Sequence, residues 1–386
     1  MSGADLGSQI DVDRTDIADW LNPLHKPLRH KLGLLCLVLL AVLPLALTRS
    51  EAQTFATAFF FAMFAMSWDS VSGYTGQISF GHSVFFAVGG YTSALLNLHM
   101  GLSPLLAIPV GVILAAIFGL VIGVPALRLR GPYLSLVTLI APLILLQLFV
   151  VFGDTLGGNT GLDNPQSLFG LGFTDVLPLY YLAFGLFLFV MFVLLAVTRS
   201  DAGRVFTAIR ESEDAVNSAG LNPAKFKTFA FVLSAALGGL AGAVYVHTPL
   251  VTPTPSALLA LFINIEIIIA VIIGGMGTIV GAAAGGIFFV VARYYLNQLH
   301  FTVPLLGTPI SDVNLLLFAV ISLVLVYALP GGLLRGGIVL GRRLLDRQTG
   351  DSEDVATDGG QTEFANPLAQ IYDNYRGFFG GDDDER

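Results

Sequence analysis

Long apolar runs, separated by short polar segments, dominate the chain from residue 32 to residue 340. A transmembrane helix needs about 20 predominantly apolar residues, and about ten runs in this chain approach that length. The runs cover residues 32–48, 53–72, 80–99, 104–126, 133–152, 178–198, 227–247, 257–274, 279–298 and 312–329. The pattern therefore predicts an all-α fold, a polytopic membrane helical bundle of about ten transmembrane spans.

The two ends of the chain differ from this region because they are polar. Residues 1–31 carry acidic side chains followed by a basic cluster, and they lack the basic start and small-residue cleavage site of a secretory signal peptide. The C-terminal segment combines acidic side chains and glycine with few apolar residues, which is typical of a disordered tail. We therefore predict an N-terminal tail (1–31), a transmembrane domain (32–340) and an acidic C-terminal tail (341–386).

Positive charges predict the orientation of the spans. The chain has 19 Lys and Arg residues, and nearly all fall on one side of the membrane if the N-terminus is cytoplasmic. Residues 153–178 contain none, which is typical of an external loop under the positive-inside rule. Both termini, and both tails, are thus expected in the cytoplasm. Arg293 is an exception, and we expect its side chain to reach the outer interface beside neighbouring tyrosines.

Composition agrees with a multi-pass protein of the cell membrane, with the lipid bilayer as its surroundings. Hydrophobic residues make up 55% of the sequence and charged residues only 12%, whereas soluble domains carry about 25% charged residues. The formal net charge of -8 argues against nucleic acid as a partner. A single cysteine, Cys36, excludes an internal disulfide.

Glycine and polar side chains interrupt the apolar pattern between residues 73 and 96. Backbone loosened by glycine, and polar groups that lack water, need partners in protein or in a wet cavity, so such a stretch indicates a transport path. Close helix packing is the alternative, and we favour it for the glycines. The structural glycines are Gly73, Gly76 and Gly81, and the side chains predicted to line the substrate path are Gln77, Ser79 and His82.

A second polar group lies in the eighth predicted span. Asn264 and Glu266 stand inside an apolar run, where an ionised carboxylate is costly unless it faces water or a partner. Both residues are therefore candidates for the substrate path; the alternative is a hydrogen-bonded carboxylate that holds two helices together. Glycines follow between residues 274 and 286, and the ones expected to be structural are Gly274, Gly275 and Gly277.

The largest predicted cytoplasmic loop covers residues 199–226. Apolar residues at helical spacing predict one amphipathic helix over residues 202–219, which Gly220 ends, while Asn222 and Pro223 begin the next helix. Such an elbow is either a docking element for a cytoplasmic partner or an interfacial helix among the lipid headgroups. These residues are compatible with both readings.

Three segments together resemble one transporter family. They are GYTGQISFGHSVFFAVGGYTSALL at 73–96, GRVFTAIRESEDAVNSAGLNPAKFKTFAFVLSAALGGLAGAVY at 203–245 and NIEIIIAVIIGGMGTIVGAAAG at 264–285. In this order and spacing they are similar to the signature regions of LivM-type permease subunits of branched-chain amino-acid ABC importers. The acidic tails depart from the family's pattern. The resemblance is less specific for the substrate, because urea, amide and aromatic-acid importers use similar permeases.

The resemblance implies a permease that, with a second related permease subunit, forms the path for branched-chain amino acids or for a related small polar solute such as urea or an amide. Two cytoplasmic ATPase subunits would bind ATP, and an external binding protein would deliver substrate. The chain has no G-x-x-x-x-G-K-[ST] motif, so no cofactor is expected in the chain itself. The 199–226 loop matches the family's coupling region, and the expected ATPase contacts are Arg204, Arg210, Glu211, Glu213 and Gly220.

Two other classes of protein compete with this reading. A single-chain secondary transporter or channel would use ionisable residues deep in the membrane, a part that Asp69, His82 and Glu266 could play. The two glycine-interrupted regions have the same predicted orientation, however, which argues against an inverted repeat. A membrane enzyme would need a metal or nucleophile motif. Neither H-E-x-x-H nor G-x-S-x-G occurs, so we predict no catalytic and no metal-binding residues.

Overall fold

The computed structural model describes residues 28–127, 132–163 and 165–298, together with residues 320, 323, 324, 327, 332 and 333. All of them belong to one compact unit, Met1–Ile338. The predicted C-terminal tail (341–386) lies outside the described residues, as do most of the N-terminal tail (1–31) and most of the last predicted span (312–329).

The described part of the chain consists of helices joined by loops and contains no β-strand. Its longer helices are α2 (Leu28–Val42), α3 (Arg49–Thr75), α4 (Ser83–Met100), α5 (Pro104–Ala126), α6 (Pro132–Val151), α8 (Val176–Thr198), α11 (Pro223–Tyr245), α13 (Leu261–Gly274) and α14 (Ile279–Asn297). The short helices are η2 (Leu43–Leu45), α7 (Gly153–Leu156), η3 (Leu168–Gly170), α9 (Asp201–Glu211), α10 (Glu213–Ser218) and α12 (Pro255–Leu259). The all-α prediction is confirmed.

Seven of the described helices are long and apolar enough to cross a membrane. They are Arg49–Thr75, Pro104–Pro125, Tyr133–Val151, Val176–Thr198, Pro223–Tyr245, Pro255–Gly274 and Ile279–Asn297, of which Pro255–Gly274 combines α12 and α13. The first predicted run corresponds to a shorter apolar helix, Gly33–Leu45. The predicted run at 80–99 is α4, which begins only at Ser83 and is enriched in glycine and polar side chains. The structure therefore supports a multi-span membrane domain, while the count of ten spans stays a prediction.

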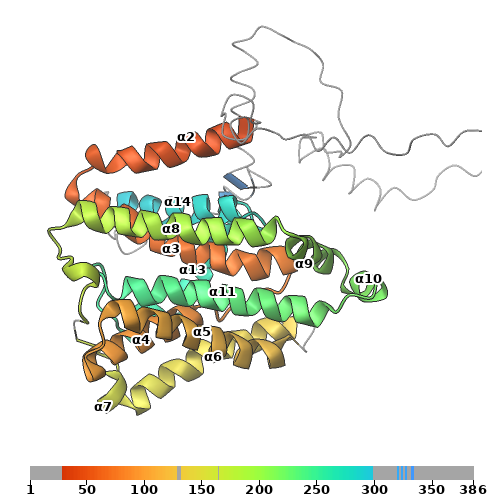
Figure 1. The fold of residues 1–386 in the computed structure, drawn as a ribbon, viewed down its shortest axis with the longest axis horizontal. Helices are drawn as coiled ribbons and strands as arrows, with labels where there is room; N and C mark the ends of the chain where they lie inside the picture. Colours follow the sequence, from red (N-terminus) through yellow and green to blue (C-terminus); the bar gives the residue numbers. More distant parts are fainter. Residues whose placement is uncertain are drawn as a thin grey trace, which may run out of the picture. The chain divides into compact units, whose positions relative to one another are not determined.

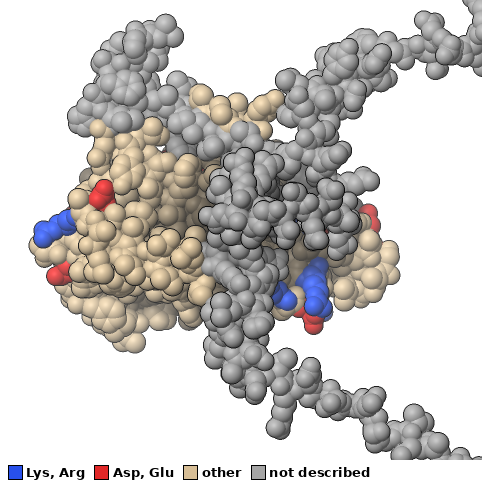
Figure 2. Space-filling view, turned by 90° about the horizontal axis from the view of Figure 1, so that it is seen from above, with Lys and Arg blue, Asp and Glu red and all other residues tan. Residues whose placement is uncertain are grey.

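The surface of the bundle agrees with a lipid environment. Figure 2 shows the described charged side chains near opposite ends of this face, and the described surface left visible between them by the grey atoms is uncharged. Helices α5, α6 and α8 expose large apolar side chains such as Ile113, Ile144 and Phe192. Exposed apolar surface of this extent is rare in soluble monomers and is expected where lipid tails cover the protein.

Helix α3 lies at the centre of the described bundle, between α8 and α11 (Figure 1). It also packs against α13 and α14, and most of its side chains are buried. Its small residues allow close approach, so a Cβ added to Gly286 of α14 would lie 2.8 Å from the Cα of Ala62. With 27 residues, α3 is about 40 Å long. One helix thus connects the two ends of the membrane domain.

Helices α4 and α11 approach each other closely through glycines. A Cβ added to Gly242 would clash with the carbonyl oxygen of Phe86, and one added to Gly89 would clash with the carbonyl oxygen of Gly239. These contacts involve backbone atoms, which cannot move aside as a flexible side chain can. The interface therefore requires glycine at both positions.

We expect Gly242→Ala to lower the thermal unfolding midpoint of the purified protein, because overpacking of a tight interface costs about 1–3 kcal/mol. Gly185→Ala in α8 is the matched control, since a Cβ at Gly185 would meet no atom within 4 Å. The control should be neutral or slightly stabilising. Equal midpoints for Gly242→Ala and the wild-type protein would show that α4 and α11 are not closely packed here.

The loop between α6 and α8 is fixed to the ends of α4 and α11. The side-chain Oδ1 of Asn97 accepts a hydrogen bond from the backbone N–H of Gln166 at 2.8 Å. His247, just after α11, receives the N–H of Leu168 on its carbonyl oxygen at 2.8 Å, and its ring Nδ1 lies 2.7 Å from the carbonyl oxygen of Gln166. Because a carbonyl only accepts, Nδ1 carries the proton in that bond. The loop predicted to be external is thus a folded segment.

Acid should weaken this docking through His247. Burial lowers the pKa of the His247 imidazole below its ordinary value, and hydrogen bonds to the backbone of Gln166 and Ser93 offset part of that effect. The folded state then stays neutral while the unfolded chain binds a proton below about pH 6.5, so stability falls as the pH decreases through that range. Thermal unfolding at pH 7.5 and pH 5.5 measures this. His247→Asn should reduce the pH dependence, and an unchanged dependence would exclude His247 as its source.

Candidate functional site

A cavity of about 400 Å³ opens between α3, α13 and α14. Helix α3 contributes Thr54, Thr57, Phe61 and Phe64, which share one face because they follow one another at helical spacing. Phenylalanines from α4 and α14 add to the aromatic part of the lining, which also contains polar and charged side chains. An apolar cavity with a few convergent polar groups is the usual form of a small-molecule site.

Glu266 and Arg293 supply the charged part of this lining. The Arg293 Nη1 donates to the Glu266 Oε1 at 2.6 Å, which joins α13 to α14. The Glu266 side chain is 13% exposed and the Arg293 side chain 47%. The sequence predicted Arg293 as an interfacial residue and did not foresee its partner. The available signal was the presence of two lone, opposite charges in consecutive apolar helices, since each needs a partner in lipid.

The cavity lies toward the N-terminal end of α3. Two tyrosines join the C-terminal end of α14 to this end of α3. Tyr294 OH donates to Ser50 Oγ at 3.0 Å, and Tyr295 OH donates to Glu51 Oε1 at 3.0 Å. The loop that precedes α3 is external in the predicted orientation. The cavity therefore belongs to the half of the domain predicted to face outward.

His82 lies directly behind the cavity. Its ring stacks on Phe64, with 5.3 Å between the ring centroids, and it is fully buried. The Nε2 atom is 3.0 Å from Ser67 Oγ and 3.3 Å from Ser234 Oγ. Both hydroxyls already donate to carbonyl oxygens, Ser67 to Phe64 and Ser234 to Ser67. Nε2 must therefore be a donor, and His82 links α3, α4 and α11 instead of opening freely into the cavity.

Asn264 and Ser79 are also buried, and both have hydrogen-bond partners. Asn264 Oδ1 accepts from the Ser83 N–H, and Asn264 Nδ2 donates to Ser83 Oγ, each at 2.8 Å. The Ser79 Oγ accepts from the Gly81 N–H at 3.4 Å, and the Ser79 carbonyl oxygen accepts from Trp68 Nε1 at 2.7 Å. These contacts fix the start of α4. Neither residue lines the cavity described above.

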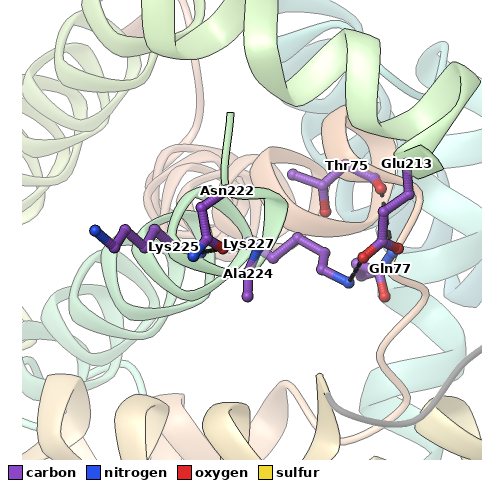
Figure 3. Close-up of polar contacts among 7 residues, drawn as sticks. All are labelled: Thr75, Gln77, Glu213, Asn222, Ala224, Lys225 and Lys227. Carbon is purple, nitrogen blue, oxygen red and sulfur yellow. Dashed lines mark hydrogen bonds and ion pairs between the residues drawn. The ribbon is translucent and has the colours of Figure 1, made fainter. Parts of the chain in front are cut away.

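Gln77 lies elsewhere, beyond the C-terminal end of α3. It is partly exposed, and its Nε2 donates to the carbonyl oxygen of Thr75 at 3.4 Å. Figure 3 shows it on the same side as Glu213 of the 199–226 loop and Lys227 of α11. Of the five residues predicted to line a substrate path, the structure therefore places Glu266 in the cavity, His82 behind it, Ser79 and Asn264 at the start of α4, and Gln77 near the cytoplasmic loop.

The glycines of the two interrupted regions meet at the C-terminal end of α3. Asp69 Oδ1 accepts from the Gly277 N–H at 2.7 Å, and a Cβ added to Gly73 would clash with that same carboxylate oxygen. Gly76 ends α3 with a φ of 73°, and Gly277 has a φ of 83°, a region that favours glycine. From the sequence, Asp69 was a candidate only for ion coupling in a single-chain transporter; in the structure it joins the two regions. The remaining predicted glycines also make close backbone contacts, Gly81 with Thr138, Gly274 with Gly281, and Gly275 with Gly332.

The 199–226 loop reaches this same point through Arg210. The Arg210 Nη1 donates to the Gly73 carbonyl oxygen at 2.7 Å, and it would lie 2.6 Å from a Cβ added to Gly277. One side chain from α9 thus contacts both interrupted regions. This contact was not predicted, because it joins residues 137 positions apart.

The predicted single helix over residues 202–219 is in fact two helices. Ser212 separates α9 from α10 with an extended backbone, and its side chain accepts from the Ala215 N–H to begin α10. Gly220 then follows with a φ of 82°, and the Asn222 side chain begins α11 as predicted. Figure 3 shows the ion pair at this corner, in which Lys227 Nζ donates to Glu213 Oε1 at 2.8 Å.

The other predicted contacts of this loop point to solvent. Arg204 pairs with Asp201 at 3.0 Å, with side chains that are 80% and 94% exposed, and Glu211 is also exposed. An exposed pair of this kind contributes little to stability. The loop therefore has one face turned to the membrane domain, where Arg210 bonds Gly73 and Glu213 pairs with Lys227 of α11, and a charged face exposed to solvent.

Comparison with known proteins agrees with the sequence resemblance. The family described as "Branched-chain amino acid transport system / permease component" matches residues 52–329. The chain is 30% identical over 300 residues to the high-affinity branched-chain amino acid transport system permease protein LivM of Escherichia coli strain K12, covering 70% of each chain. It is 28% identical over 293 residues to the permease protein BraD of Pseudomonas aeruginosa, covering 71% of this chain and 91% of the other.

A third relative is the probable branched-chain amino acid transport permease protein LivH of Methanocaldococcus jannaschii, 26% identical over 237 residues, which cover 58% of this chain and 73% of that protein. No solved structure shows a significant match. The family match spans both glycine-interrupted regions, the cavity and the 199–226 loop. The chain is therefore a multi-pass membrane protein that belongs to the branched-chain amino acid transport system permease family.

Proposed function

We propose that this chain is the permease subunit of an ATP-binding-cassette importer for branched-chain amino acids. It pairs with a second, related permease, and two cytoplasmic ATPase subunits bind and hydrolyse the ATP, so the chain itself carries no cofactor. An external binding protein delivers the substrate. The domain has about ten spans, with both termini in the cytoplasm. Relatives named as LivM, LivH and BraD permeases support this proposal.

The contact between Arg210 and the two interrupted regions carries the coupling part of the proposal. A partner that moves the 199–226 loop moves the Arg210 guanidinium, which is bonded to the Gly73 carbonyl oxygen and lies against Gly277. Gly73 lies in the last turn of α3 and Gly277 just before α14, so their displacement changes how the central helices pack. Such an element can have two discrete arrangements, and ATP binding by the partner would bias one of them.

The cavity and the Arg210 contact lie toward opposite ends of α3. Phe64 and His82 separate them, since Phe64 lines the cavity and stacks on His82. In the proposed cycle, substrate enters the outward half, and rearrangement near His82, Ser79 and Asn264 opens the way toward Gln77. Alternating access of this kind needs both an accessible cavity and a barrier behind it.

ATPase activity of the purified complex tests the proposed function. The complex of this chain with its second permease, ATPase subunits and loaded binding protein should hydrolyse ATP faster with leucine or valine than with urea or aromatic acids. Stimulation by urea alone would reassign the substrate. Absence of stimulation by every solute in the panel would contradict the importer assignment.

Gly220 provides a test of coupling within the loop. Proline cannot adopt the φ of 82° found at Gly220, so Gly220→Pro should displace α10 and reduce the uptake obtained per ATP hydrolysed by more than about tenfold. Gly220→Asn is the matched control, because asparagine tolerates this conformation. Unchanged coupling in Gly220→Pro, with normal membrane insertion, would remove this turn from the mechanism.

A further inference from the structure

We infer that Glu266 and Arg293 form the binding site for the zwitterionic backbone of an α-amino acid. Glu266 would accept from the substrate ammonium group, Arg293 would donate to the substrate carboxylate, and the aromatic part of the lining would receive the aliphatic side chain. This inference rests on the proposed function and adds the residues that bind the ammonium and carboxylate groups common to all α-amino acids.

The charged pair retains the capacity that this role needs. A guanidinium has five N–H donors and a carboxylate has two oxygens, and the bond between Arg293 Nη1 and Glu266 Oε1 uses one donor and one oxygen. The second oxygen can accept from an ammonium group while other guanidinium N–H groups bind a carboxylate in a fork geometry. Opposite charges set side by side match the two charges of an α-amino acid.

The surroundings match the rest of a branched-chain substrate. Phe60, Phe61, Phe64, Ile263 and Phe289 line the same cavity as the charged pair. Its volume of about 400 Å³ lies in the range typical of small-molecule sites. The side chain of Glu266 is only 13% exposed, so water competes weakly for its charge-assisted bonds. An apolar wall beside a charged pair is complementary to leucine, isoleucine and valine.

The location is also suitable for capture. The cavity lies near the N-terminal end of α3, which is tied to the end of α14 through Tyr294 and Tyr295. That end is predicted to be external, so a substrate released by a binding protein would reach it first. The competing explanation is that Glu266 and Arg293 only join α13 to α14, and the test below separates the two.

Photo-labelling detects weak binding at a defined place. The complex of this chain with its second permease and ATPases, in lipid nanodiscs and without the binding protein, would be irradiated with photo-leucine, whose diazirine lies in the side chain. We expect mass spectrometry to locate the label on the aromatic part of the lining. Leucine should compete with the label. Leucinamide, which lacks the carboxylate, and 4-methylpentanoate, which lacks the ammonium group, should each compete at least about tenfold more weakly.

Variants add a second measurement. Glu266→Gln and Arg293→Gln should each reduce labelling by about tenfold or more, the loss expected for one charge-assisted hydrogen bond. Asp201→Asn, which removes an exposed charge at the start of α9, outside the cavity lining, should leave labelling unchanged. Labelling elsewhere, or equal competition by leucine and both analogues, would overturn the proposed binding site. If leucine still stimulates the ATPase activity of the complex, the proposed importer function is unaffected by that result. Absence of leucine-stimulated ATP hydrolysis in the wild-type complex would instead contradict the proposed function.

Discussion

Replacing Arg210 with alanine should reduce ATP-driven uptake by more than about tenfold while the chain still inserts and assembles. The substitution removes the hydrogen bond from Nη1 to the Gly73 carbonyl oxygen, 2.7 Å in the structure. A bond from a charged group to a part-buried carbonyl contributes about 1.5–3 kcal/mol, and 1.4 kcal/mol corresponds to a factor of ten. Uptake and ATP hydrolysis are measured on the same proteoliposomes, so that their ratio reports coupling.

Two controls make the result specific. Lys225→Ala removes an exposed cation near the start of α11 that is not among the expected ATPase contacts, so it should leave the ratio at the wild-type value. Arg210→Lys keeps the charge but loses the forked geometry, and an intermediate ratio is expected. A wild-type ratio in Arg210→Ala would show that the bond to Gly73 plays no part in coupling.

Replacing Asn264 with alanine should strongly lower the stability of the protein. Helix α4 begins at Ser83, and the residue before it, His82, provides no side-chain cap. Asn264 caps the helix from 181 residues away, with Oδ1 on the Ser83 N–H and Nδ2 on Ser83 Oγ. Alanine leaves both groups buried without these bonds, which costs roughly 2–5 kcal/mol.

The thermal unfolding midpoint of detergent-solubilised protein measures this effect. Asn264→Asp keeps an acceptor for the Ser83 N–H but buries a carboxylate in place of a neutral amide, so it should lower the midpoint as well. Asn217→Ala serves as a control, because Asn217 is exposed on α10. If Asn264→Ala unfolds at the wild-type midpoint and only transport changes, then Asn264 serves the substrate path and not the start of α4.

Local pattern was sufficient to predict most helices. The apolar run at 104–126 became α5, Pro104–Ala126, and the run at 279–298 became α14, Ile279–Asn297. Both helices begin at clear sequence signals, a serine and proline in one case and a threonine after glycines in the other. Hydrophobic periodicity reports the local environment of each residue, so it succeeds where lipid or core surrounds a continuous helix.

The same pattern could not predict where polar backbone interrupts a helix. The run at 257–274 contains a break at Ala260, between α12 and α13. The pattern did not reveal this break because the residues on both sides of it are similarly hydrophobic. The break at Ser212 in the predicted helix at 202–219 was likewise not visible in the hydrophobic pattern. Serine is tolerated inside helices as well as at their caps, so its role depends on the surrounding fold.

Pairing between distant residues also lay beyond the sequence. The sequence identified Glu266 as a residue that needs a partner, and the structure shows that the partner is Arg293. The sequence likewise placed Arg210 in the coupling loop. The contact of Arg210 with Gly73, however, depends on how α9 packs against α3. A single sequence records which groups are costly to bury, and only the fold shows which of them meet.

Uptake by reconstituted vesicles tests the importer assignment most directly. Proteoliposomes would contain either this chain alone or this chain with its second permease and ATPase subunits, with loaded binding protein on the outside and labelled leucine as the substrate. We expect ATP-dependent uptake only in vesicles that contain the whole complex. Leucine uptake by this chain alone, driven by an ion gradient in the absence of ATP, would contradict the importer assignment.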